Sequence, residues 1–162
     1  MILPLDIRNM GFCLVDAEAT DIEGFVRVKR LSLKKYNDEF REFFGEWDDE
    51  FNVIEFHRRM KLSFFNKLIF DGEVVGFLNY DIKEDKIDDI SIAIIEKAQN
   101  KGVGSFFVSH LVTLSKEMSK PVYISVVKSN PAQNLYMRLG FEIYEEKDVF
   151  YLLRYIPSIN LA

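Results

Sequence analysis

The stretch QNKGVG, residues 99–104, decides the fold, because it joins two elements of opposite character. Before it, Ile90 to Ile95 is an almost uninterrupted apolar run rich in β-branched residues, which is typical of a strand buried on both faces. After it, apolar side chains recur every three or four residues from Val103 to Met118. This spacing predicts an amphipathic helix that begins at the glycines and ends near Lys120.

The junction between that strand and that helix has the geometry of a phosphate-binding site. The first N–H groups of a helix lack internal partners, and the helix dipole makes the potential there positive. Gly102 and Gly104 would let the backbone approach a ligand closely, and Lys101 adds a positive charge. A Walker-type loop is excluded because no Gly-Lys-Ser/Thr follows. A dinucleotide fingerprint also fails, since Phe107 stands where its third glycine would fall.

Outward from this segment, the chain alternates between strand and helix patterns. The sequence predicts strands at Phe12–Val15, Lys67–Phe70, Val74–Tyr80, Pro121–Val127, Phe141–Tyr144 and Val149–Tyr155, and helices over 22–31, over 51–60 and between Pro131 and Gly140. Thr20-Asp21 offers N-caps for the first helix, and Asp71-Gly72 offers a tight hairpin turn. This order predicts an α/β (α+β) fold with a mixed, largely antiparallel sheet, helices on both faces and a parallel strand pair around the glycine loop.

Composition limits the classes of protein that the chain can represent. A single domain over residues 1–162 is expected, because 162 residues suit one folding unit and no linker interrupts them. A formal charge of −5 with mixed acids and bases argues against a nucleic-acid partner. The longest uncharged run, residues 102–115, is too short to span a membrane, and no secretory signal is seen, so we expect a cytoplasmic protein without a membrane partner. One cysteine and two distant histidines predict no metal site.

A second motif lies downstream, NPAQNLY at residues 130–136, followed by Gly140-Phe141. Together with QNKGVG it resembles the signature motifs of the GNAT acetyltransferase superfamily, and the joint match covers roughly residues 88–141. The order of predicted elements also resembles that family's fold. Two departures occur. Glu96-Lys97-Ala98 replaces the Pro-x-Tyr often found in this loop, and Gln99 stands where Arg is more frequent.

The resemblance implies that acetyl-CoA is the donor and that no metal takes part. The strand that ends at Ile94 would diverge from the next parallel strand, so that its unpaired backbone groups could bind the pantetheine arm. The donor-binding residues that the resemblance implies are Ile92, Ala93, Ile94, Gln99, Asn100, Lys101, Gly102, Val103, Gly104, Ser105, Asn130 and Asn134. Asn130 has an alternative role as the cap of the helix that Pro131 begins, and the sequence does not choose between the two.

The resemblance also implies two catalytic residues. Tyr136 matches a tyrosine that protonates the departing CoA thiolate, a role open to a phenol with an ordinary pKa of about 10, although core packing is the alternative. Asp88, 11 positions before Gln99, matches a carboxylate that accepts the amine proton through water. Asp89 is its rival, and neighbours on an extended strand point to opposite faces, so only one of the two would face the site.

The activity implied is transfer of an acetyl group to a primary amine of a small molecule or peptide by direct attack. The alternative is a CoA-binding regulatory module of the same fold without transferase activity, against which the intact second motif argues. The acidic stretch Asp38–Glu50, which contains Trp47, is either a solvated helix face or a surface that attracts a cationic amine. Phe150–Ile156 would form an apolar edge strand that pairs with a second copy as a homodimer. The identity of the acceptor stays open.

Overall fold

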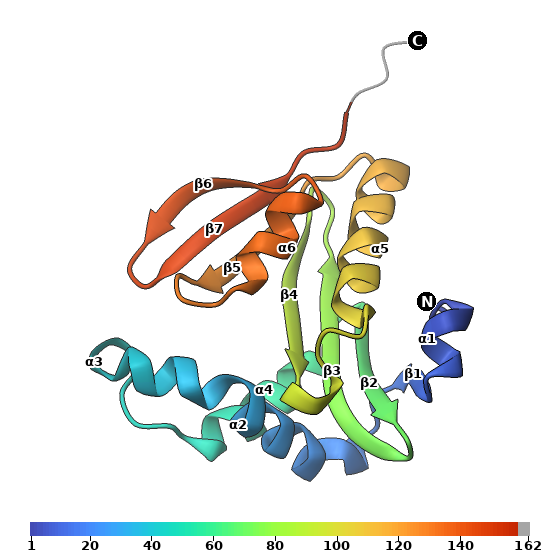
Figure 1. The fold of residues 1–162 in the computed structure, drawn as a ribbon. Coiled ribbons are helices and arrows are strands. Elements are labelled where there is room, and N and C mark those ends of the chain that lie inside the picture. The colour runs from blue at the N-terminus through green and yellow to red at the C-terminus, as the bar shows by residue number, and fades with distance from the viewer. Residues whose placement is uncertain (159–162) are drawn as a thin grey trace. The chain divides into compact units, whose positions relative to one another are not determined.

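The computed structural model describes residues 1–158, and these form a mixed sheet of seven strands with accompanying helices (Figure 1). The strands are β1 (Phe12–Asp16), β2 (Phe64–Phe70), β3 (Glu73–Ile82), β4 (Ile87–Ile94), β5 (Val122–Val127), β6 (Glu142–Lys147) and β7 (Phe150–Tyr155). Their order in the sheet is β1-β2-β3-β4-β5-β7-β6. Strands β4 and β5 pair in parallel, whereas β1–β2, β2–β3, β5–β7 and β6–β7 are antiparallel. The predicted fold class is confirmed.

The helices follow the periodicity of the sequence with two additions. They are α1 (Leu5–Asn9), α2 (Ile22–Glu39), α3 (Arg41–Phe44), α4 (Asp49–Arg59), α5 (Val103–Met118) and α6 (Ala132–Arg138), with short 3₁₀ helices at Ala19–Asp21 and Glu96–Ala98. The sequence predicts α2, α4, α5 and α6 but neither α1 nor α3, because five and four residues are too few to show an apolar period. Within residues 1–158, no helix has both the length and the apolar character that crossing a bilayer requires.

The chain divides into two compact units. The first contains residues 1–80 and 91–104, and the second contains residues 81–90 and the described chain from residue 105 onward. Strands β3 and β4 and helix α5 each contribute residues to both units. The single domain over residues 1–162 therefore stays a prediction, and the two units are described separately below.

Four phenylalanines form the core of the first unit. Phe25 of α2 packs against Phe56 of α4 and Phe77 of β3, with ring centroids 5.5 and 5.3 Å apart, and Phe65 of β2 completes the cluster. All four are at most 7% exposed, so each contributes roughly 2–3 kcal/mol of burial free energy. This cluster holds α2 and α4 side by side on the sheet strands β2 and β3 (Figure 1).

The β2–β3 turn has the backbone geometry that the sequence predicts, whereas the residue at the N-cap of α2 makes other contacts than the predicted cap. Asp71 and Gly72 have φ angles of 49° and 80°, as the predicted two-residue hairpin turn requires. Asp21 stands at the N-cap of α2, but its carboxylate does not cap that helix. It accepts hydrogen bonds from Glu18 N at 2.7 Å and from Lys67 Nζ at 3.0 Å. Asp21 thus links the start of α2 to β2 through Lys67 and does not cap the helix.

The second unit has an apolar core and a three-stranded end of the sheet. Ile87, Phe107, Leu111, Val122 and Leu153 are all fully buried there. Strand β7 lies between β5 and β6 and pairs with both, so Phe150–Tyr155 is not an edge strand as the sequence predicted. The charged run 145–148 was expected to separate two strands, but β6 continues through Lys147 and the turn comes at Asp148, with φ 55°. The outermost position therefore belongs to β6, whose residues are all exposed.

Candidate functional site

The glycine loop leads from the end of β4 into α5 within the first unit. After Ile94 the chain makes the 3₁₀ turn Glu96–Ala98 and then reaches Asn100 and Gly102, whose φ angles are 59° and 90°. Two left-handed residues within three positions turn the backbone sharply before α5 begins at Val103. A side chain at Gly102 would be strained by that angle, although the nearest atom lies no closer than 3.5 Å.

The side chain of Gln99 closes this loop on the preceding strand. Its Nε2 donates a hydrogen bond to the carbonyl oxygen of Ile94 at 2.7 Å. Gln99 is therefore used as an internal clamp, whereas Asn100 and Lys101 are exposed at the start of the helix. The exposed groups, rather than Gln99, are the ones available to a ligand there.

Glu73 anchors the same loop from outside, and the sequence offered no signal for this role. Its carboxylate pairs with Lys97 in the 3₁₀ turn and accepts a hydrogen bond from Arg27 of α2 at 2.7 Å. Lys97 forms an ion pair with Glu73, whereas Lys101 forms no ion pair with any described acid.

The end of β4 runs unusually close to β3. Ile95 N donates to Val75 O at 2.9 Å, and a Cβ built on Gly76 would lie 2.9 Å from Ala93 O and 3.2 Å from the side chain of Ile94. Such distances leave no room for a side chain at position 76. A glycine inside a strand pattern often marks a close backbone approach, so this position is one that the sequence pattern could have flagged. It fixes where Ala93 and Ile94 stand.

Tyr136 lies in the second unit, on α6. It is only 5% exposed and packs on Phe141, with ring centroids 6.0 Å apart. Phe141 in turn contacts Tyr155 of β7. Burial raises the pKa of Tyr136, so its phenol stays protonated at neutral pH. In the described part of the chain its hydroxyl has no hydrogen-bond partner, which leaves that donor available.

The three other candidates of the second unit that lie on or before helices differ in what they do. Asn130 Oδ1 accepts a hydrogen bond from Ala132 N at 2.9 Å, so the expected capping contact is present. That contact uses the oxygen of the amide and leaves its NH₂ group for another partner. Asn134 is exposed on α6, and Ser105 is exposed in the first turn of α5. Donor contacts by these three residues stay predictions.

Asp88, also in the second unit, sits in an ion-pair cluster at the β3–β4 hairpin. Lys83 Nζ lies 2.8 Å from its carboxylate, and Lys86 Nζ lies 3.6 Å away. The neighbouring Asp89 has a φ of 53°, which breaks the extended strand. The expectation that the two acids alternate across a regular strand therefore does not apply here, and the orientation of each has to be taken from its own contacts.

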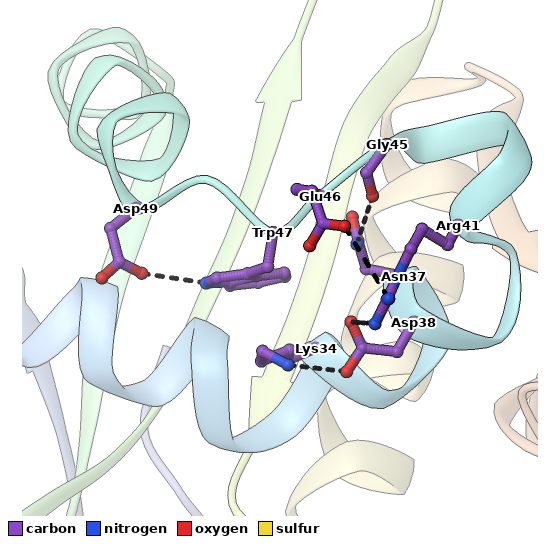
Figure 2. Close-up of polar contacts among 8 residues, drawn as sticks. All are labelled: Lys34, Asn37, Asp38, Arg41, Gly45, Glu46, Trp47 and Asp49. Atoms are coloured by element: carbon purple, nitrogen blue, oxygen red, sulfur yellow. Dashed lines mark hydrogen bonds and ion pairs between the residues drawn. The ribbon is translucent and has the colours of Figure 1, made fainter.

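The acidic stretch 38–50 lies in the first unit, and three of its acids, Asp38, Glu46 and Asp49, pair with nearby cations. Figure 2 shows Asp38 with Lys34 and Arg41, at 2.6 and 3.6 Å, and Trp47 lying along α2. Trp47 Nε1 donates to Asp49 Oδ1 at 2.9 Å, and Asp49 also pairs with Arg30. Asp48 caps α4 by accepting from Glu50 N at 2.9 Å. This local use of the acids favours the solvated-face interpretation over attraction of a cationic amine.

No three His, Cys, Asp or Glu side chains among residues 1–158 come together as a metal-binding group.

The parallel ladder between β4 and β5 consists of the pair Ile87 and Val122, at the beginning of both strands. A pair that is joined only at its start is what a splayed strand pair requires.

The sequence model of the acetyltransferase (GNAT) family matches residues 33–141. This match spans more than half of the chain and includes the glycine loop, α5 and α6. The chain belongs to the GNAT acetyltransferase family. No curated protein sequence matches it significantly.

Solved GNAT structures share the fold at low sequence identity. The PaiA N-acetyltransferase of Thermoplasma acidophilum, in complex with coenzyme A, has a TM-score of 0.67 and 15% identity, covering 91% of this chain and 99% of its own. Ard1 of Thermoplasma volcanium has a TM-score of 0.65 and 21% identity with the same coverage. The ribosomal-protein-S18-alanine N-acetyltransferase of Escherichia coli has a TM-score of 0.64 and 16% identity, covering 93% and 99%. These likenesses show the fold.

GNAT acetyltransferases use acetyl-CoA, and the glycine loop fits the diphosphate of such a donor. The loop presents the N-terminus of a 16-residue helix, the left-handed Asn100 and Gly102, and the exposed Lys101. No acidic residue lies within the loop segment 99–104 to repel a phosphate. The residues present therefore suit this co-substrate.

Proposed function

We propose that this GNAT acetyltransferase transfers the acetyl group of acetyl-CoA to a primary amine by direct attack. The observation that carries the proposal is the glycine loop at the start of α5, clamped to the end of β4 by Gln99. It combines a helix N-terminus suited to an anion with an adjacent strand end. There the backbone N–H of Ile94 would donate a hydrogen bond to the thioester carbonyl. The acceptor is an amine on a small molecule or a peptide.

In this proposal the donor lies along β4 and the loop. Ile92, Ala93 and Ile94 supply backbone hydrogen bonds to its pantetheine arm, and residues 99–105 bind its diphosphate. Asn130 contributes its free NH₂ group, since its oxygen is taken by Ala132 N. Asn134 binds at the phosphate end. Bound acetyl-CoA supplies an activated thioester whose carbonyl carbon an amine can attack.

The protein then handles two protons and one developing negative charge. The backbone N–H of Ile94 donates to the thioester oxygen and stabilises the charge that grows there. Tyr136 donates a proton to the sulfur as the carbon–sulfur bond breaks, which suits a phenol that burial keeps protonated. Asp88 takes the proton that the attacking amine loses through a chain of waters, because six residues of strand, about 20 Å, separate it from Ile94 on β4.

The assignment of Asp88 has its own test. The contacts of this carboxylate with Lys83 and Lys86 leave lone pairs on its oxygens, and Asp88 Oδ1 has no hydrogen-bond partner among the described residues, so a proton can still be accepted. Asp88→Asn should lower kcat/KM most at low pH, where the unprotonated amine is scarce, and Asp89→Asn should not. Identical pH profiles for Asp88→Asn and the natural protein would remove Asp88 from the mechanism.

The alternative is a regulatory module that binds CoA without transfer. Release of free CoA thiol from acetyl-CoA separates the two, measured with a panel of amines, peptides and polyamines. A transferase releases thiol with at least one class of amine, whereas a module shows no release although acetyl-CoA still raises its melting temperature. Absence of that stabilisation would contradict both functions.

A further inference from the structure

Lys29 occupies an unusual place between α2 and α4. It lies on the face of α2 that also buries Phe25 and Val28, and only 7% of the residue is exposed. Its Nζ lies 5.9 Å from the centre of the Phe25 ring. Among residues 1–158 its ammonium group forms no hydrogen bond and no ion pair. A lysine so deeply placed normally has a carboxylate partner.

The nearest charged groups do not balance Lys29. Arg59 of α4 is buried beside it and donates to Asn79 Oδ1 at 2.9 Å and to Glu55 Oε2 at 3.2 Å. Glu55 also accepts two hydrogen bonds of 2.9 Å from the guanidinium group of Arg58. Glu55 is therefore shared by two guanidinium groups, and Lys29 forms no ion pair with it or with another described acid.

The burial of Lys29, without an ion pair in the described chain, changes its pKa. Burial, and then the positive charge of Arg59, lower the pKa of Lys29 to about 7, while Glu55 opposes the change only in part. An unpaired buried ammonium is costly, and an anion placed against it would remove the cost. The cluster is not sealed, because the side chains of Arg59 and Glu55 keep 10% and 16% of their surface exposed.

We propose that Lys29 and Arg59 form a binding site for a carboxylate group of the acceptor, which makes the acceptor an amino acid or another amine that carries a carboxylate. The inference rests on the proposed function for its link to the acceptor. A carboxylate fits because the buried ammonium of Lys29, which forms no ion pair among the described residues, can donate charge-assisted hydrogen bonds to it.

The position of the cluster in the first unit suits an acceptor site. Asn79, which holds Arg59, lies on β3 four residues beyond Val75, and Val75 is hydrogen-bonded to the end of β4. Four residues of strand span about 13 Å. An acceptor that reaches from this site to the strand end at which the thioester is proposed to lie therefore needs a chain between its carboxylate and its amine.

The first experiment measures binding without transfer. The melting temperature of the full chain is recorded at pH 7 and constant ionic strength with sodium propionate or with the uncharged propionamide. Propionate should raise it in the natural protein and in Lys35→Met, a control at an exposed position of the same helix, but not in Lys29→Met. Methionine fills the same space without charge, so this variant should fold at least as well. An unchanged melting temperature in the natural protein, or an equal rise in Lys29→Met, overturns the site.

The second experiment tests the acceptor. An α-amino acid, 4-aminobutyrate and 6-aminohexanoate are each compared with the matching carboxamide in the thiol-release assay. At least one carboxylate should exceed its carboxamide by about tenfold or more in kcat/KM, and Lys29→Met should remove that preference. Equal use of both forms overturns the assignment to the acceptor. Propionate binding without acetylation of any amine would instead contradict the proposed function and leave the anion site standing.

Discussion

The side-chain amide of Gln99 donates a hydrogen bond to the carbonyl oxygen of Ile94 at 2.7 Å. This bond spans the turn between β4 and α5 and brings the start of the helix back onto the strand end. The path of the loop therefore depends on a neutral amide rather than on a charge that reaches toward the ligand. If this loop binds the donor as proposed, its geometry is present before the donor arrives, which lowers the entropic cost of binding.

Gln99→Ala should weaken donor binding as well as the fold. Loss of the bond is expected to cost about 1 kcal/mol of stability and to raise the KM for acetyl-CoA several-fold, with kcat less affected. Asn37→Ala is the control, because it removes a similar amide-to-carbonyl bond, to Gly45, away from this loop. Steady-state kinetics and calorimetric titration with CoA measure the effect. Equal donor affinity in the two variants would contradict the role of Gln99 as a clamp.

Gly76→Ala should destabilise the protein by about 1–3 kcal/mol, because the new methyl group would lie 2.9 Å from Ala93 O. The strand end would have to move, so acetyl-CoA affinity should fall as well. Gly24→Ala is the matched control, since nothing lies within 4 Å of its Cβ position in α2. That change should stabilise the chain by up to about 1 kcal/mol. Chemical denaturation measures both, and a tolerated Gly76→Ala would show that β3 and β4 can separate freely.

The sequence predicts the elements whose signal is local and regular. The strand, glycine loop and α5 follow from a change of apolar period around residues 99–104, and the Asp71-Gly72 turn follows from its need for positive φ. The cap at Asn130 is equally local, because its amide bonds to a backbone group two residues away. Such contacts join residues close together in the sequence, so the sequence alone can indicate them.

Other features depend on which segments meet, and one sequence does not give that. The sequence places Gln99 in a phosphate-binding loop, but it does not show that the side chain of Gln99 bonds to Ile94 at the end of β4. Phe150–Tyr155 has the composition of an edge strand, yet β6 covers it. Lys29 has i, i+4 spacing from Phe25 and so lies on the buried face of α2, but a lysine within a basic run is ordinarily assigned to solvent.

Lys29 should make stability depend on pH in a window that can be assigned. Burial lowers the pKa of Lys29 to about 7 in the folded chain, against 10.5 when exposed. Between these values the unfolded chain binds more protons, so the unfolding free energy should rise with pH. Lys29→Met lacks this effect. It should be more stable than the natural protein near pH 6, with the gap narrowing toward pH 10.5. Urea denaturation across this range measures the gap, and a gap that does not vary with pH would contradict the assignment.

Tyr136→Phe should separate chemistry from binding. The ring would still pack on Phe141, and no hydrogen bond within the described chain is lost, so the fold and the KM for acetyl-CoA should change little. If the phenol protonates the thiolate, kcat should fall by about 100-fold or more at neutral pH. Tyr155→Phe is the control, because Tyr155 contacts the same Phe141 ring without a proposed role. Because burial raises the pKa of Tyr136, the natural enzyme should show no loss of kcat at mildly alkaline pH from deprotonation of this group. A variant that keeps full turnover would return Tyr136 to the core of the second unit and leave water as the acid.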